Sequence, residues 1–152
     1  MATILVDQSY KIEQTNHDTI IAATRGQDAA AVQIDRRLKR TLLQEFGQRV
    51  GGRRIYLWLF AFGACIAIAK LWRKGDIIRI DLEYEGSSSL VEDLVAAYLL
   101  KEGIIVNRTS IASARVGKHS FADSVSRIPP LAKHFLRLDV SMAKQVTAAL
   151  GL

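Results

Sequence analysis

Residues 76–86 read DIIRIDLEYEG, in which apolar and charged residues alternate as they do in a half-buried β-strand. Gly86 ends the pattern. Apolar residues recur instead at helical spacing before this stretch, in 35–46, and after it, in 87–103. A strand between two helices is the repeating unit of a parallel sheet with helical crossovers. The chain is therefore predicted to belong to the α/β class.

The N-terminal region adds antiparallel strands to this sheet. Two runs, Thr3–Ile12 and Thr19–Thr24, are rich in β-branched residues, and the turn-forming residues TNHD lie between them. They predict a β-hairpin, followed by a short third strand at Ala30–Ile34. A further strand is expected within 104–116, with its best part at Ile111–Val116. The sheet is thus predicted to be mixed.

Helices are marked by caps and by apolar spacing. Asp35 is placed to cap a helix that the glycines of 47–52 end. Segment 87–103 predicts a second helix, and a short third helix follows Gly117 and stops before Pro129. The apolar stripes expected to face the core are Leu38, Leu42 and Phe46 in the first helix, and Leu90, Leu94 and Tyr98 in the second.

Residues 55–72, IYLWLFAFGACIAIAKLW, are apolar enough to raise the question of a membrane span. Arginine or lysine stands at both ends of the run, so no charge asymmetry orients it across a bilayer. We interpret it as a buried core element, extended before Gly63 and helical after it, and expect no stable membrane insertion. The N-terminus lacks the pattern of a secretory signal, which favours a cytoplasmic location.

The whole chain of 152 residues is the size of one domain, with a core at about 3–128 and a helical tail at 129–152. Its net charge is +6 and its pI is about 9.7. A basic balance favours a polyanionic partner such as DNA or RNA. The chain cannot form an internal disulfide, since Cys65 is its single cysteine.

Four carboxylates are candidates for chemistry. Asp7 interrupts an apolar strand, where an ionised group needs compensation. Asp81 and Glu83 are two apart, so they share one face of their strand, and Asp123 lies in the short helix after Gly117. If the two strands are neighbours, these groups converge. Converging carboxylates suit Mg²⁺ or Mn²⁺, and a two-ion site would hydrolyse phosphodiesters.

The segments ILVDQSYK (4–11) and IIRIDLEYEG (77–86) resemble the first and fourth strands of the ribonuclease H-like superfamily. Together with VGKHSFADSVSR (116–127), they also resemble a group of uncharacterised ribonuclease H-like proteins from archaea and mobile elements. The resemblance spans roughly residues 3–128 and implies a single-domain, three-layer ribonuclease H-like fold with a mixed sheet and flanking helices.

The resemblance implies a metal-dependent nuclease. Asp7, Asp81 and Asp123 correspond to the acids of the first strand, fourth strand and last helix, and would bind the metal. The family's acid on the first long helix has no good counterpart, and Glu83 is the substitute. Residues expected at the nucleic acid are Lys118 and His119 in the turn, and Arg36, Arg37 and Arg40, which with Lys39 form a basic stripe on the first helix.

Each candidate also has a purely structural explanation. Asp123 stands three residues after Ser120, as in a capping box, and Asp81 can accept a hydrogen bond from a turn amide. Asp7 would be ordinary on an exposed edge strand, and Glu83 would be a solvated side chain. Lys118, His119 and the basic stripe are equally explained as surface residues. The alternative functions are a non-catalytic nucleic-acid-binding or protein-interaction domain and, less favoured, a single-span membrane protein.

Overall fold

The computed structural model describes residues 1–81, 84, 86–117 and 120–152. Its strands form one six-stranded sheet in the order β5-β4-β1-β2-β3-β6. The strands are β1 (Thr3–Ser9), β2 (Thr19–Arg25), β3 (Asp28–Ile34), β4 (Ile77–Asp81), β5 (Ile111–Ala114) and β6 (His134–Leu138). The α-helices in the described part are α1 (Arg36–Val50), α2 (Gly52–Ala69), α3 (Ser88–Lys101), α4 (Phe121–Arg127) and α5 (Ala143–Leu150).

The sheet is mixed, as the sequence predicts. β1, β2 and β3 pair antiparallel in series, while β4 pairs parallel with β1 and β5 pairs parallel with β4. Helical crossovers connect the parallel strands, with α1 and α2 between β3 and β4 and α3 between β4 and β5. The predicted α/β class and the predicted antiparallel hairpin with parallel strands are therefore confirmed.

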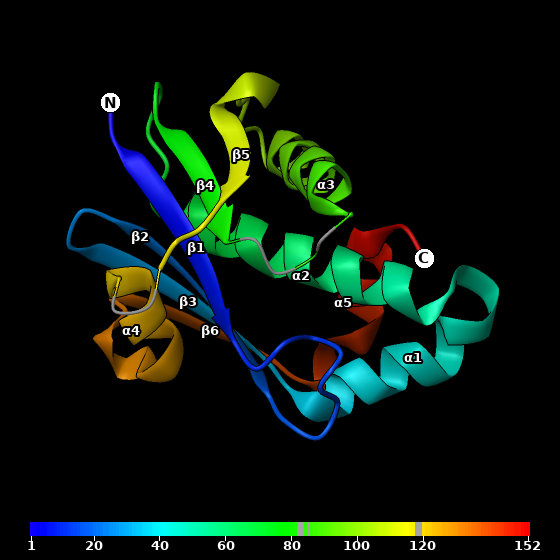
Figure 1. The fold of residues 1–152 in the computed structure, drawn as a ribbon. Coiled ribbons are helices and arrows are strands. Elements are labelled where there is room, and N and C mark those ends of the chain that lie inside the picture. The colour runs from blue at the N-terminus through cyan, green and yellow to red at the C-terminus, as the bar shows by residue number, and fades with distance from the viewer. Residues whose placement is uncertain (82–83, 85, 118–119) are drawn as a thin grey trace.

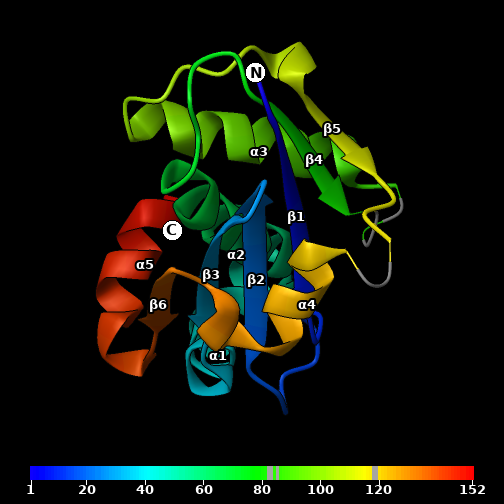
Figure 2. The same cartoon turned by 90° about the vertical axis from the view of Figure 1, so that its left-hand side faces the viewer.

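The helices divide unequally between the two faces of the sheet. Figures 1 and 2 show α1, α2, α3 and α5 on one face and the short α4 alone on the other, over β1 and β2. Most of the core lies in the thick layer, where α2 packs against β2 and β3.

Helix α2 corrects the prediction for the apolar run. It is one continuous helix, so the extended conformation expected before Gly63 is wrong. Both halves are buried, with Ile55 and Leu59 before the glycine and Ala64 and Ile68 after it. By length and composition α2 would suffice to cross a membrane, but 56% of it is buried inside the fold. A helix enclosed on most sides loses the amphipathic period, which is why its pattern was ambiguous.

Helix α1 begins as predicted, because the Asp35 carboxylate accepts a hydrogen bond of 2.8 Å from the Arg37 amide. One residue of its predicted basic stripe is misplaced. The Lys39 side chain is 0% exposed, and its ammonium group donates to the Gln14 carbonyl and to Thr19 Oγ1, each at 2.9 Å. The exposed stripe on α1 therefore consists of Arg36, Arg37 and Arg40.

Two C-terminal predictions also need correction. The core stripe of α3 is Val91, Val95, Tyr98 and Leu99, so it is rotated from the predicted one, and Leu90 is exposed. The tail predicted to be helical includes a strand, β6, between a short 3₁₀ helix at Pro129–Leu131 and α5, and β6 pairs parallel with β3 at the sheet edge. Four of the five β6 residues are exposed, so the strand has little apolar alternation in its sequence. Backbone pairing with β3 determines its conformation.

Gly63 allows α2 to lie close to the sheet, and this generates a test. A Cβ at this position would lie 2.5 Å from Ile21 Cδ1 and 3.3 Å from Ile34 Cδ1. We expect Gly63→Leu to lower the free energy of unfolding by about 1 to 3 kcal/mol through overpacking. Urea unfolding would measure the change.

The matched control is Gly47→Leu in α1, where a Cβ would meet only Leu43 Cδ2 at 3.9 Å. Replacing a helical glycine in open space is expected to be neutral or to stabilise by up to about 1 kcal/mol. Equal effects of the two substitutions would contradict the close approach of α2 to the sheet.

Candidate active site

A cleft of about 520 Å³ opens where β1 and β4 end, beside α4. Its lining includes three carboxylates, from Asp7 on β1, Asp81 on β4 and Asp123 on α4. Two guanidinium groups, those of Arg115 and Arg127, line the same cleft. The three aspartates singled out by the sequence are thus brought together from three separate elements, with two cations that the sequence reading missed.

The parallel register of β1 and β4 explains why two of the aspartates meet. Val6 pairs with Ile80, so the next residues, Asp7 near the end of β1 and Asp81 at the end of β4, lie side by side on the same face. Val6 and Ile80 are buried in the main core. Because side chains alternate along a strand, both aspartates face the opposite side, where α4 carries Asp123.

The Asp7 carboxyl is in an unfavourable place for a negative charge. It is 7% exposed, and within the described chain its only hydrogen bond comes from the Gln8 amide, at 2.8 Å. Burial raises its pKa from 3.8 to about 6; the Gln8 hydrogen bond and Arg127 oppose the rise, while Asp81 and Asp123 add to it. The exposed-edge explanation of Asp7 is wrong, since β1 is flanked by β2 and β4.

Asp81 and Asp123 have partners within the protein. The Val116 amide donates to Asp81 Oδ1 at 3.0 Å, and Arg127 Nε lies 3.4 Å from Asp123 Oδ1. The Asp123 amide donates to Ser120 Oγ at 3.0 Å, which is the predicted capping interaction. The structural explanation holds for Asp81, while for Asp123 only the serine half of the capping box forms, since the Ser120 amide donates to the Gly117 carbonyl.

The cleft can be compared with the needs of Mg²⁺ or Mn²⁺. In the described part of the chain, no three His, Cys, Asp or Glu side chains already form a group that could hold a metal ion. The type of donor nevertheless fits a hard cation, because all three acids offer carboxylate oxygens. Asp7 in particular is a buried carboxylate with a single hydrogen-bond donor, and a cation would compensate its charge.

The remaining predicted residues fall into two groups. Glu83, Lys118 and His119 lie outside the described residues. Arg36, Arg37 and Arg40 are exposed on α1 and do not line the cleft. Arg115 and Arg127 were missed, although each had a local signal: Arg115 lies near the end of the predicted strand segment Ile111–Val116, and Arg127 is four residues after Asp123, one helical turn away.

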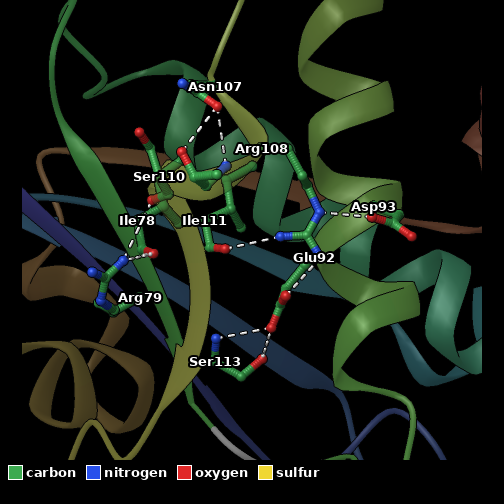
Figure 3. A network of polar contacts seen from close by, with 10 residues as sticks. Ile78, Arg79, Glu92, Asp93, Asn107, Arg108, Ser110, Ile111 and Ser113 are labelled. Carbon is green, nitrogen blue, oxygen red and sulfur yellow. Dashed lines mark hydrogen bonds and ion pairs between the residues drawn. The ribbon is translucent and has the colours of Figure 1, made fainter.

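A polar network supports the β5 side of the cleft (Figure 3). The Glu92 carboxylate on α3 accepts from the Ser113 amide at 2.9 Å and from the Ser113 hydroxyl at 2.7 Å. It also receives Arg108 Nη2 at 2.7 Å, while Arg108 Nε contacts Asp93 at 2.6 Å. Ser113 of β5 is paired with Ile80 of β4, so this network fixes β5 beside β4. Asp81 is the next residue on β4, and Val116 follows soon after Ser113 in the chain.

No protein-family model matches this chain, and no curated protein or solved structure matches it significantly. The chain's own cleft, with its converging aspartates and its two arginines, therefore carries the functional inference.

The raised pKa of Asp7 predicts a pH-dependent effect of removing its charge. Ionisation of the Asp7 carboxyl lowers the free energy of unfolding. This loss is complete above about pH 6 and absent below about pH 4. Asp7→Asn is therefore expected to raise the free energy of unfolding at pH 8 by about 2 to 3 kcal/mol, at about 1.4 kcal/mol per pKa unit. The gain should disappear on acidification to pH 4, as measured by urea unfolding.

Asp76 provides a control, because removing its charge is expected to change the stability in the opposite direction. Its buried carboxylate accepts from Arg25, and this hydrogen bond is the main cause of the fall in its pKa to about 2; the Arg73 and Ala2 amides also lower it. Asp76→Asn should therefore destabilise the protein by about 2 kcal/mol at pH 7, with the loss shrinking as pH falls from about 4 to 2. A pH-independent effect of Asp7→Asn would contradict the description of its site.

Glu92 and Asp93 provide a second matched pair, because both bind Arg108. The Glu92 side chain is 13% exposed and the Asp93 side chain 63% exposed. We expect Glu92→Gln to destabilise the protein by about 1 to 3 kcal/mol, since a charged acceptor of three partly buried donors is lost. Asp93→Asn should cost about 0.5 kcal/mol or less. Equal losses in thermal or urea unfolding would show that Glu92 does not anchor β5.

Proposed function

We propose that this protein is a divalent-metal-dependent nuclease that hydrolyses phosphodiester bonds of DNA or RNA. The observation that carries the proposal is the buried Asp7 carboxyl, which faces Asp81 and Asp123 in a cleft that also contains Arg115 and Arg127. An acid whose pKa is strongly perturbed by burial and by neighbouring charges in a cleft is a candidate functional group. A nucleic-acid substrate carries negative phosphates with associated cations. The arginines suit the phosphates, and the carboxylate cluster suits the cations.

The arrangement of the sheet supports the same proposal. The ribonuclease H-like resemblance implies an antiparallel hairpin joined to parallel strands by helical crossovers. It also implies an acid on the first strand, another at the end of the fourth and a third on the last helix of the site. Asp7, Asp81 and Asp123 occupy these places in the chain.

The protein groups have separate roles in this proposal. Asp7, Asp81 and Asp123 would hold Mg²⁺ or Mn²⁺, which when bound activates water and stabilises the leaving oxygen. Arg115 and Arg127 are exposed at the cleft and would bind the phosphates on either side of the scissile bond. The net charge of +6 favours encounter with a polyanion.

A second candidate function is a non-catalytic nucleic-acid-binding domain with the same cleft. It is favoured by the contacts that already occupy two of the aspartates, from Val116 to Asp81 and from Arg127 to Asp123. The absence of a preassembled metal group among the described residues points the same way. In this case the arginines bind phosphate and the aspartates act only in the structure.

Cleavage assays distinguish the two. We expect the wild-type protein to cleave at least one of a set of duplex, hybrid, branched and single-stranded substrates with Mg²⁺ or Mn²⁺. Asp7→Asn and Asp81→Asn should each reduce the rate at least roughly 100-fold, because each removes a metal ligand. Asp28→Asn, which removes an exposed carboxylate outside the cleft, is the control and should retain the rate.

Thermal unfolding with and without millimolar Mn²⁺ tests metal binding independently of the substrate. A working site should raise the midpoint of the wild type and of Asp28→Asn by mass action, but not that of Asp81→Asn. Binding of oligonucleotides without cleavage, and with no shift by Mn²⁺, would support the non-catalytic domain. Identical behaviour of wild type and folded Asp7→Asn on every substrate would overturn the nuclease.

A further inference from the structure

An aromatic pair stands at the edge of the cleft. Tyr10 follows the last residue of β1, lines the cleft and is 51% exposed. Its ring is stacked on His17, with the centroids 4.1 Å apart and the planes at 11°. His17 thus covers one face of the ring, while about half of Tyr10 as a residue stays accessible at the cleft.

The backbone holds Tyr10 in an uncommon conformation. Its φ is 59°, in the left-handed region, and it is the only non-glycine residue with positive φ in the described chain. The Tyr10 carbonyl accepts a hydrogen bond of 2.7 Å from Thr19 Oγ1, and Thr19 is fully buried. This hydrogen bond joins the start of the β1–β2 loop to the start of β2.

Lys39 extends this support into the core. Its buried ammonium group donates to Thr19 Oγ1 and to the Gln14 carbonyl, both at 2.9 Å. Burial lowers the pKa of Lys39 to about 8, so a charged amine is kept in the interior at a cost. A lysine, a threonine and two carbonyls thus preorganise the short loop that carries Tyr10 and His17.

The loop also connects the cleft to the arginines of α1. The Arg36 amide donates to Asp18 Oδ1 at 2.9 Å, so the end of the loop lies against the start of α1. Figure 1 shows the loop between α4 and α1. A strand that crosses the Tyr10 ring and leaves the cleft on this side would pass toward Arg36 and Arg40, which are exposed on α1.

We propose that the stacked Tyr10–His17 pair is a platform that binds an unpaired nucleobase next to the phosphate in the aspartate cleft. The inference rests on the proposed function and specifies its substrate: a single strand, or a duplex with an unpaired nucleotide. Bases within a duplex are stacked on their neighbours and present no free face to Tyr10. An exposed aromatic ring stacks on bases of any sequence, because every base has a flat face.

Binding to a short single-stranded oligonucleotide containing 2-aminopurine tests the platform without cleavage. All measurements use the Asp7→Asn background in EDTA, with fluorescence anisotropy for affinity and 2-aminopurine quenching for stacking. Tyr10→Leu is expected to weaken single-strand binding by roughly 10- to 100-fold and to remove the quenching. Tyr10→Phe keeps the ring and should retain both.

Two controls separate stacking from general damage. Phe135→Leu removes an aromatic ring of similar exposure, 49%, from β6 and should leave binding unchanged. A fully paired duplex of the same sequence should bind the Tyr10→Leu and Tyr10→Phe variants equally. Thermal unfolding of each variant shows that it is folded before its affinity is measured.

The outcomes distinguish the platform from the proposed function. Single-strand binding that is unaffected by Tyr10→Leu, or a loss that is equal on duplex, would overturn the platform while the nuclease proposal stands. Binding with the expected Tyr10 dependence, but without cleavage by the Asp7-containing protein in Mn²⁺, would support the platform and the non-catalytic domain. No binding of either form of nucleic acid by the Asp7→Asn protein would overturn the platform, and if the Asp7-containing protein in Mn²⁺ also cleaves none of the substrates, the proposed function fails with it.

Discussion

The candidate site depends on the register of one parallel pairing, that of β1 with β4. Asp7 and Asp81 meet because Val6 is opposite Ile80. A slip of one residue would move one aspartate to the other face of the sheet, into the core. Asp76 secures the register at the far end of the two strands: its carboxylate accepts from the Ala2 amide and binds Arg25 of β2. The Ile77 amide also donates to the Ala2 carbonyl at 2.9 Å.

The two ends of this pairing treat a buried carboxylate in opposite ways. Asp76 receives two backbone amides and a bidentate guanidinium, so the folded state favours its charge and its pKa falls to about 2. Asp7 receives one amide and faces two other acids, so its charge is disfavoured and its pKa rises to about 6. Hydrogen bonds within the protein compensate the charge of Asp76, whereas the charge of Asp7 has little compensation. An unfavourably placed charge of this kind is expected where a bound ligand completes the site.

The parts of the fold that the sequence predicts well are those encoded in local patterns. The alternation around Asp81 and the caps at Asp35 and Ser120 identify β4, α1 and α4 directly, and an acid within the apolar first strand already marks Asp7. Features set by tertiary contacts were missed. β6 depends on pairing with β3, and α2 has no apolar period because it is enclosed. Lys39 lies on the polar side of its helix pattern but is buried by a loop that only the fold brings to it. The stacking of Tyr10 on His17 likewise has no signature in the sequence.

The membrane-like composition of α2 follows from the unequal layers of the sheet. One face of the sheet carries four helices and the other only α4, so α2 is covered by β2 and β3 on one side and by α1 and α3 on the other. A helix in that position needs apolar residues all round, and Gly63 brings it within contact of Ile21. On the face that carries only α4, a cleft opens at the ends of β1 and β4. The unequal layers therefore account both for the membrane-like composition of α2 and for the polar cleft where Asp7, Asp81 and Asp123 gather.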